Sequence, residues 1–185
     1  MNRPEEPILS PSRLLIVYSS MTGGTRGLAL AARDAASRAA ALDSGSTSNG
    51  LRPVEVVMRE ARDADGADLV AADAMLFATP ENLGAMAGLM KDFFDRSYYA
   101  ALDQVAGRPY ALMVCAGSDG QGAVRQVERI ATGLRLRQIA PPLVVNLGAQ
   151  QPAEILAPKR VLPAHLAKAA ELGEAMAAGL TLGLW

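Results

Sequence analysis

The stretch that decides the fold is RLLIVYSSMTGGT, at residues 13–25. Its first six residues form a short apolar run that ends in small polar residues, which is typical of a strand buried on both faces. The hydroxyl residues and glycines that follow lead directly into an alanine-rich stretch with helical spacing, which starts at Thr25. The segment therefore predicts a buried strand, a tight polar loop and a helix in direct succession.

The same order of strand and helix recurs along the rest of the chain. The first helix is expected to end at the polar stretch DSGSTSNG, residues 43–50, which predicts a flexible loop. Five strand–helix units in sequence favour a parallel sheet covered by helices on both faces. The remaining elements are expected as strands at 54–58, 74–79, 109–117 and 142–147, and as helices at 67–72, 85–99, 124–136 and 163–180.

Length and composition fit one globular domain. The chain has 185 residues, of which 50% are hydrophobic and 20% charged, so one packed core is expected. Residues 1–12 contain three prolines and predict a flexible tail, which leaves residues 13–185 as a single domain. The 18 basic and 19 acidic residues give a net charge of −1, so neither nucleic acid nor a membrane surface is expected as a partner.

The cysteine content and the chain start point to the cytoplasm. Cys115 is the only cysteine in the sequence, which excludes an intrachain disulfide and a cysteine-based zinc cluster. The first residues lack the basic start and apolar stretch of a signal peptide, and no apolar run reaches the ~20 residues needed to span a bilayer. A lone cysteine is commonly a small buried hydrophobe, and no metal site is expected.

Ligands of open parallel sheets collect at the carboxyl ends of the strands, so the loops at those ends are the candidate site. The first loop places three hydroxyl groups and two glycines at a helix N-terminus, where they would surround an anion with donors. It lacks the lysine of an ATPase P-loop and the GxGxxG spacing of a dinucleotide turn, so a monophosphate held without a dedicated lysine fits better. A well-capped helix after a tight turn is the alternative. The candidate residues are Ser20, Met21, Thr22, Gly23, Gly24 and Thr25.

Two further loops have unusual compositions. After the strand at 74–79, Pro80 fixes one backbone angle and Gly84 frees another, so that amides and the Asn82 side chain can face a flat polar ring. After the strand at 109–117, three glycines would allow a bulky ligand to approach the backbone. An ordinary capped loop and a flexible turn are the respective alternatives. The candidate residues are Pro80, Glu81, Asn82, Leu83, Gly84, Gly117, Ser118, Asp119, Gly120, Gln121 and Gly122.

These three loops carry a family resemblance. The first resembles the flavodoxin phosphate loop, T/S-x-T-G-x-T, and residues 79–96, TPENLGAMAGLMKDFFDR, are similar to the second loop and helix of the NAD(P)H-dependent FMN reductases and WrbA-type quinone reductases. The segment AGSDGQG, at 116–122, resembles their glycine-rich third loop. The resemblance covers roughly residues 13–148 and implies a flavodoxin-like three-layer sandwich with a five-stranded parallel sheet in the order 2-1-3-4-5.

The resemblance also implies a cofactor and an activity. FMN would place its phosphate on residues 20–25, the pyrimidine side of its ring on 80–84, and the other edge on 117–122. Because the flavin carries the chemistry, no catalytic side chain is expected. The implied protein is a homodimer or homotetramer that takes electrons from NAD(P)H and passes them to a quinone, a flavin or a similar small acceptor.

Two other functions remain open on the sequence alone. A flavodoxin-type electron-transfer protein would serve a protein partner, but the residues expected to flank the ring, at 82–83 and 118–119, include no aromatic one. Their composition favours a two-electron reductase over a one-electron carrier. A domain that binds another phosphate ligand and no flavin is the third possibility.

Overall fold

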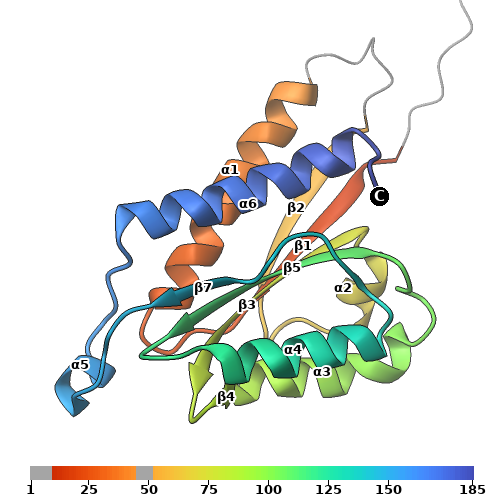
Figure 1. Cartoon of the computed structure of the whole chain (residues 1–185). Coiled ribbons are helices and arrows are strands. Elements are labelled where there is room, and N and C mark those ends of the chain that lie inside the picture. The colour runs from red at the N-terminus through yellow and green to blue at the C-terminus, as the bar shows by residue number, and fades with distance from the viewer. Residues whose placement is uncertain (1–9, 45–51) are drawn as a thin grey trace, which may run out of the picture.

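The computed structural model describes residues 10–44 and 52–185 (Figure 1). Most of the tail expected at 1–12, and most of the loop expected at 43–50, lie outside these ranges. Residue 12, expected in the tail, begins the first strand, and residues 43 and 44, expected in the loop, belong to the first helix. Within the described residues, the elements are β1 (Ser12–Tyr18), α1 (Gly24–Ser44), β2 (Val54–Glu60), α2 (Gly66–Ala71), β3 (Ala74–Asn82), β4 (Ala85–Met86), α3 (Gly88–Ala101), β5 (Pro109–Ala116), α4 (Gln121–Gly133), β6 (Arg137–Gln138), β7 (Leu143–Asn146), α5 (Pro152–Leu156) and α6 (Pro163–Thr181).

The sheet has the expected order of long strands. β1 pairs in parallel with β2 on one side and β3 on the other, β3 pairs with β5, and β5 pairs with β7. This is the predicted order 2-1-3-4-5, with β5 and β7 as the fourth and fifth long strands. The predicted count of five strands was wrong, because two strands of two residues each join the sheet. β4 pairs antiparallel with β3, and β6 pairs with the start of β5.

The edge strand that pairs with β5 is interrupted and forms two short strands, β6 and β7. β6 pairs with Pro109 and Tyr110 at the start of β5, and β7 pairs with residues 113–116 at its end. Pro141 and Pro142 stand between the two short strands. Proline has no amide hydrogen to donate to a neighbouring strand, so the ladder breaks at this point.

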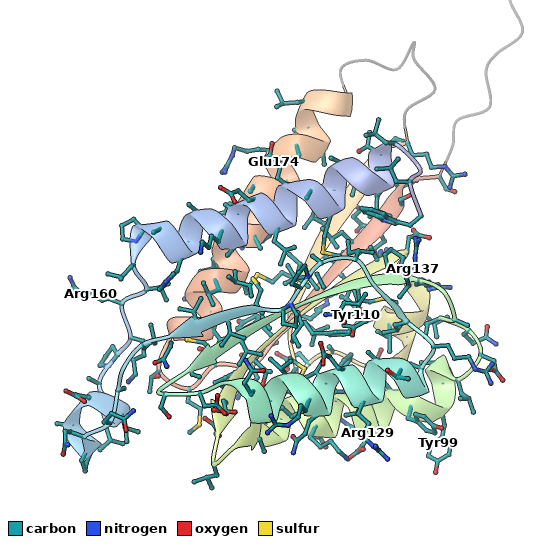
Figure 2. The ribbon with its side chains drawn as sticks, viewed as in Figure 1. Tyr99, Tyr110, Arg129, Arg137, Arg160 and Glu174 are labelled. Carbon is teal, nitrogen blue, oxygen red and sulfur yellow. The ribbon has the colours of Figure 1, made fainter. Side chains whose placement is uncertain are left out.

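Helices cover both faces of the sheet (Figure 1). On β1 the side chains alternate: Leu14 and Ile16 face the cluster that includes α1 and α6, whereas Leu15 and Val17 face the cluster that includes α3 and α4. All four are fully buried, which explains the unbroken apolar run in the sequence. Tyr110 lies inside the second cluster, and Figure 2 shows its ring between the sheet and the helices.

Several boundaries differ from those expected. β3 continues past residue 79 to Asn82, and the helix expected from residue 85 begins at Gly88, because β4 turns back along the end of β3. α4 begins at Gln121, three residues before the expected start. The short helix α5 was not predicted. In residues 10–44 and 52–185, no helix has both the length and the apolar character that crossing a membrane requires.

Candidate functional site

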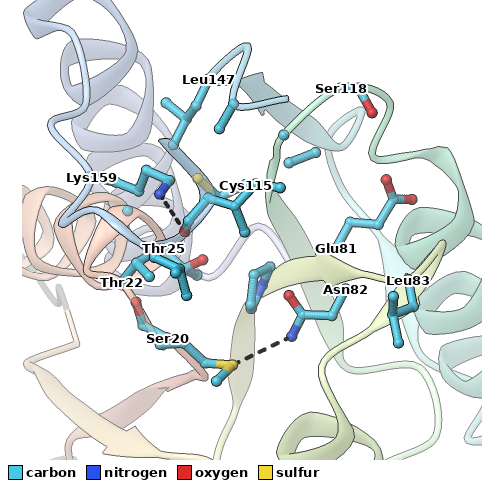
Figure 3. A pocket seen from close by; sticks show the side chains of 18 of the residues that line it. Ser20, Thr22, Thr25, Glu81, Asn82, Leu83, Cys115, Ser118, Leu147 and Lys159 are labelled. Carbon is cyan, nitrogen blue, oxygen red and sulfur yellow. Dashed lines mark hydrogen bonds between the residues drawn. The ribbon is translucent and has the colours of Figure 1, made fainter. Parts of the chain in front are cut away.

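A cleft of about 510 Å³ opens at the carboxyl ends of β1, β3 and β5 (Figure 3). All three loops expected to form a site contribute to its walls, which places the candidate residues of distant segments around one space. The predicted residues that line the cleft are Ser20, Met21, Thr22, Gly24, Thr25, Pro80, Glu81, Asn82, Leu83, Gly84, Gly117 and Ser118. The predicted residues that do not line it are Gly23, Asp119, Gly120, Gln121 and Gly122.

The loop at 20–25 is shaped by a glycine and ends in a long helix. Gly23 has a φ of +92°, a conformation that favours glycine, and its amide donates a hydrogen bond to Ser20 Oγ at 3.2 Å. α1 starts at the next residue, and the Gly27 amide donates to the Gly23 carbonyl at 2.9 Å. The amides of the first helical turn have no acceptor within the helix, and the helix dipole is positive at this end. The loop is therefore suited to hold an anion.

The loop after β3 is a tight hairpin between β3 and β4. Leu83 and Gly84 connect the paired residues Asn82 and Ala85, with φ values of +53° and +72°. Two successive positive φ values correspond to a type I′ turn, in which asparagine and glycine are the favoured residues. Leucine is strained in this conformation, and the Leu83 side chain is fully exposed at the rim of the cleft. The hairpin therefore holds an apolar side chain in water at a cost in stability.

Replacing Leu83 with asparagine is expected to stabilise the fold. Asparagine adopts the left-handed conformation more easily than leucine, so the free energy of unfolding should rise by about 1 kcal/mol. The melting temperature should then rise by about 3 °C, as measured by calorimetry. Leu42→Asn is the matched control, because Leu42 is an exposed leucine within α1 and gains no such relief. If Leu83→Asn melted at the same temperature as the unaltered protein or at a lower one, the inference that Leu83 is strained would be contradicted.

Glu81 joins the second and third loops. Its carboxylate accepts hydrogen bonds from the amides of Gly120 at 2.7 Å, Gly122 at 2.9 Å and Ala123 at 3.3 Å. These amides lie at the N-terminus of α4, where a negative charge is stabilising. A side chain from β3 thus caps α4, which explains why the helix starts earlier than its own sequence predicts.

The third loop contributes less to the cleft than expected. Gly120 and Gly122 are buried behind Glu81, and Asp119 and Gln121 are exposed outside the cleft. A Cβ atom on Gly122 would overlap with the Gly84 carbonyl oxygen, so the hairpin and the start of α4 pack closely. These glycines permit close contact between two loops.

Residues beyond the third loop complete the cleft. Asn146 Nδ2 donates to the Ser118 carbonyl, and Asn146 Oδ1 accepts from the Gly148 amide at 2.8 Å, which fixes the chain after β7 beside the third loop. The cleft also has wall residues that were not among the candidates, either because they end the strand before the third loop or because they lie beyond all three loops. They are Cys115, Ala116, Leu147, Ala149, Ile155, Leu156 and Lys159.

Lys159 attaches α5 to the first loop. Its backbone amide donates to the Thr22 carbonyl at 2.7 Å, and its ammonium group donates to the carbonyls of Glu154, Ile155 and Ala157 at 2.5, 2.8 and 2.7 Å. The ammonium therefore satisfies carbonyls at the C-terminal end of α5. At the other end of α5, the Glu154 carboxylate accepts from two backbone amides, which lowers the pKa of Glu154.

Cys115 lies on the floor of the cleft with 6% of its surface exposed. Burial raises the pKa of its thiol to about 11, against smaller opposing effects of a hydrogen bond with the Thr25 side chain and of the Lys159 charge. The thiol is therefore protonated at neutral pH, which agrees with a packing role for this residue. Among the described residues, no group of histidine, cysteine, aspartate or glutamate side chains is placed to hold a metal ion.

Solved structures share the fold. An oxidoreductase from Corynebacterium diphtheriae superposes with a TM-score of 0.67 at 17% identity, covering 95% of this chain and 99% of its own. A WrbA-like flavodoxin protein from Agrobacterium tumefaciens has a TM-score of 0.60 at 21% identity, covering 91% and 97%. A flavodoxin from Streptococcus pneumoniae has a TM-score of 0.66 at 21% identity, covering 90% and 99%. At these identities the similarity establishes the flavodoxin-like fold alone.

Sequence comparison identifies the family. No protein with a curated description matches the chain by sequence. The NADPH-dependent FMN reductase family matches residues 13–150, close to the range over which the three loops predicted a resemblance. The match includes all the candidate residues of the three loops but not α5 or Lys159. On this match, the chain belongs to the NADPH-dependent FMN reductase family, a family of FMN-binding flavodoxin-like oxidoreductases.

Proposed function

We propose that the cleft binds FMN, with the phosphate on the loop at 20–25 and the ring between the loops at 80–84 and 117–118. The observation that carries this proposal is that all three loops line one cleft. The donor groups at the head of α1 face the same cleft as the hairpin and the third loop. An anionic group and a flat ring of one ligand could therefore be held together.

The protein residues would bind and orient the cofactor. Hydroxyl groups of Ser20 and Thr22 and the first amides of α1 would donate to the phosphate, with no charged side chain needed. Cys115 and Leu147 offer apolar contacts on the floor, and a protonated thiol there adds no charge. Bound FMN would supply the redox chemistry, by accepting a hydride from NAD(P)H and passing two electrons to a small acceptor.

Titration with FMN and with riboflavin, followed by visible absorption, tests the cofactor. The protein should bind FMN, and Thr22→Val should weaken FMN binding by about tenfold, the effect of one lost hydrogen bond to a charged group. Riboflavin, which lacks the phosphate, should bind both proteins equally. Thr132→Val is the matched control, because Thr132 lies on α4 and its hydroxyl donates to the Glu128 carbonyl. If Thr22→Val weakened the binding of FMN and riboflavin equally, the proposal that this loop binds the phosphate would be refuted.

Stopped-flow mixing with NADPH tests the activity. Rapid bleaching of the flavin band is expected, because the family that matches residues 13–150 is that of the NADPH-dependent FMN reductases. A flavin that stays oxidised over minutes would instead indicate a flavodoxin-type carrier that receives electrons from a protein. The homo-oligomeric state and the cytoplasmic location stay predictions.

A further inference from the structure

The segment between β7 and α6 reaches the first loop at Lys159. The Lys159 amide donates to the Thr22 carbonyl at 2.7 Å, and a Cβ atom on Gly24 would lie only 3.3 Å from Lys159 Cβ. Figure 3 shows Lys159 on the same side of the cleft as Thr22 and Thr25. Residues 151–159, which we call the α5 brace, therefore contact the loop that is proposed to hold the phosphate.

The bond to Thr22 sets the direction of a second amide in that loop. A trans peptide group is planar, so its carbonyl and its amide hydrogen point in opposite directions. Because Lys159 holds the Thr22 carbonyl on one side, the Gly23 amide points to the other side, where it donates to Ser20 Oγ at 3.2 Å. A hydroxyl group that accepts such a bond still has its own hydrogen to donate. Ser20 lines the cleft, so its hydroxyl hydrogen is left to donate to a ligand there.

Hydrogen bonds, and not burial, hold the α5 brace in place. Residues 151–158 are all exposed. The Glu154 carboxylate accepts from two amides at the start of α5, and the Lys159 ammonium donates to three carbonyls at its end. A segment with few buried contacts opens at a small cost in free energy. A ligand that stabilises the first loop should therefore stabilise the brace as well.

We infer that Lys159 is a positioning residue for the phosphate of the cofactor, because its amide holds the first loop in the conformation that presents the donor groups. This inference rests on the proposed function of the cleft as an FMN site. The Lys159 ammonium is bonded to the α5 carbonyls, so the residue acts on the loop through its backbone and not through its charge. A loop that is held in place before binding loses less conformational entropy when the phosphate binds, and this raises the affinity. The family match ends at residue 150 and includes no part of the brace.

Two variants separate the amide of Lys159 from its charge. Lys159→Met removes the ammonium and keeps the amide hydrogen, whereas Lys159→Pro removes both. In a titration followed by visible absorption, FMN binding should weaken by about tenfold in Lys159→Pro and by about threefold in Lys159→Met. Riboflavin, which lacks the phosphate, should bind the unaltered protein and both variants equally, and equal binding also shows that the variants keep the ring site folded.

Arg160→Met is the matched control for the loss of a positive charge in this segment. Arg160 is exposed, and its side chain makes no hydrogen bond or ion pair within residues 10–44 and 52–185. The control should bind FMN and riboflavin as the unaltered protein does.

Hydrogen exchange followed by NMR measures the same coupling in the unaltered protein, so this test does not depend on the folding of Lys159→Pro. Because coupling between two sites is reciprocal, FMN should slow exchange of the Lys159 amide by the same factor, about tenfold, and riboflavin should not. The Leu102 amide, which donates to the Tyr98 carbonyl at the end of α3, is the control and should exchange at the same rate in all samples.

Three results would overturn the positioning role. The first is an equal loss of FMN affinity in Lys159→Met and Lys159→Pro that shrinks at high salt, because it would assign the effect to charge. The second is FMN affinity that is unchanged in Lys159→Pro or that falls together with riboflavin affinity. The third is a Lys159 amide that exchanges equally fast with and without FMN. Failure of the unaltered protein to bind FMN would instead refute the proposed function, and it would be seen before any variant is made.

Discussion

Replacing Glu81 with alanine is expected to lower the free energy of unfolding by about 3 kcal/mol, because one carboxylate serves three amides and its loss leaves them without an acceptor. The melting temperature should fall by about 9 °C in calorimetry. FMN affinity should fall by at least tenfold, since the second and third loops lose the side chain that joins them.

Two variants separate this role from a general effect of charge. Glu81→Gln retains one oxygen that can accept a hydrogen bond, so its stability should lie between those of the unaltered protein and Glu81→Ala. Glu174→Gln is the matched control, because Glu174 is exposed on the outer side of α6 (Figure 2). If Glu81→Ala melts at the same temperature as the unaltered protein, the three hydrogen bonds do not hold the loops together.

Gly122→Ala is expected to open the contact between the hairpin and α4. Its new Cβ would overlap with the Gly84 carbonyl oxygen and lie 3.0 Å from Glu81 Oε1. Backbone atoms cannot rotate away as a side chain can, so the hairpin must shift, at a cost of about 3 kcal/mol in the free energy of unfolding. Chemical denaturation measures that cost, and the FMN titration should show weaker binding because the ring loops separate.

Gly133→Ala is the control within the same helix. Nothing lies within 4 Å of a Cβ at this position, so the substitution should leave FMN binding unchanged and should not lower stability. Similar losses of stability and FMN affinity in both variants would mean that α4 tolerates alanine poorly in general. Normal stability and FMN affinity in Gly122→Ala would show that the hairpin can move away without consequence.

The long strands and helices could be predicted because each has a local signal. Leu14 to Val17 are buried on both faces, and this produces the continuous apolar run that identified β1. The alternation of strands and helices then restricted the topology, because parallel strands need crossover connections. The first loop was recognised because its donors and the helix that they precede are adjacent in sequence.

The limits of the prediction lie in interactions between distant residues. Gly120 and Gly122 are expected at a ligand because glycine permits close approach, and in the structure Glu81 and Gly84 approach them closely. Local sequence contains no sign that a carboxylate on β3 will cap α4. The start of that helix was therefore placed three residues late.

α5 and Lys159 were missed for a related reason. A helix of five residues is too short to display a helical repeat, and Pro152 at its first position and Pro158 after its end are typical of a loop. Lys159 acts on the first loop through its backbone amide, which every residue but proline possesses.

The interruption between β6 and β7 has a consequence for self-association. An uninterrupted strand at the margin of a sheet offers a row of free amides and carbonyls to which another molecule can add its own strand, and such addition leads to aggregates. Pro141 and Pro142 remove two donors from that row and divide it into segments of two and four residues. This margin should therefore resist the addition of a strand from another copy and growth into fibrils.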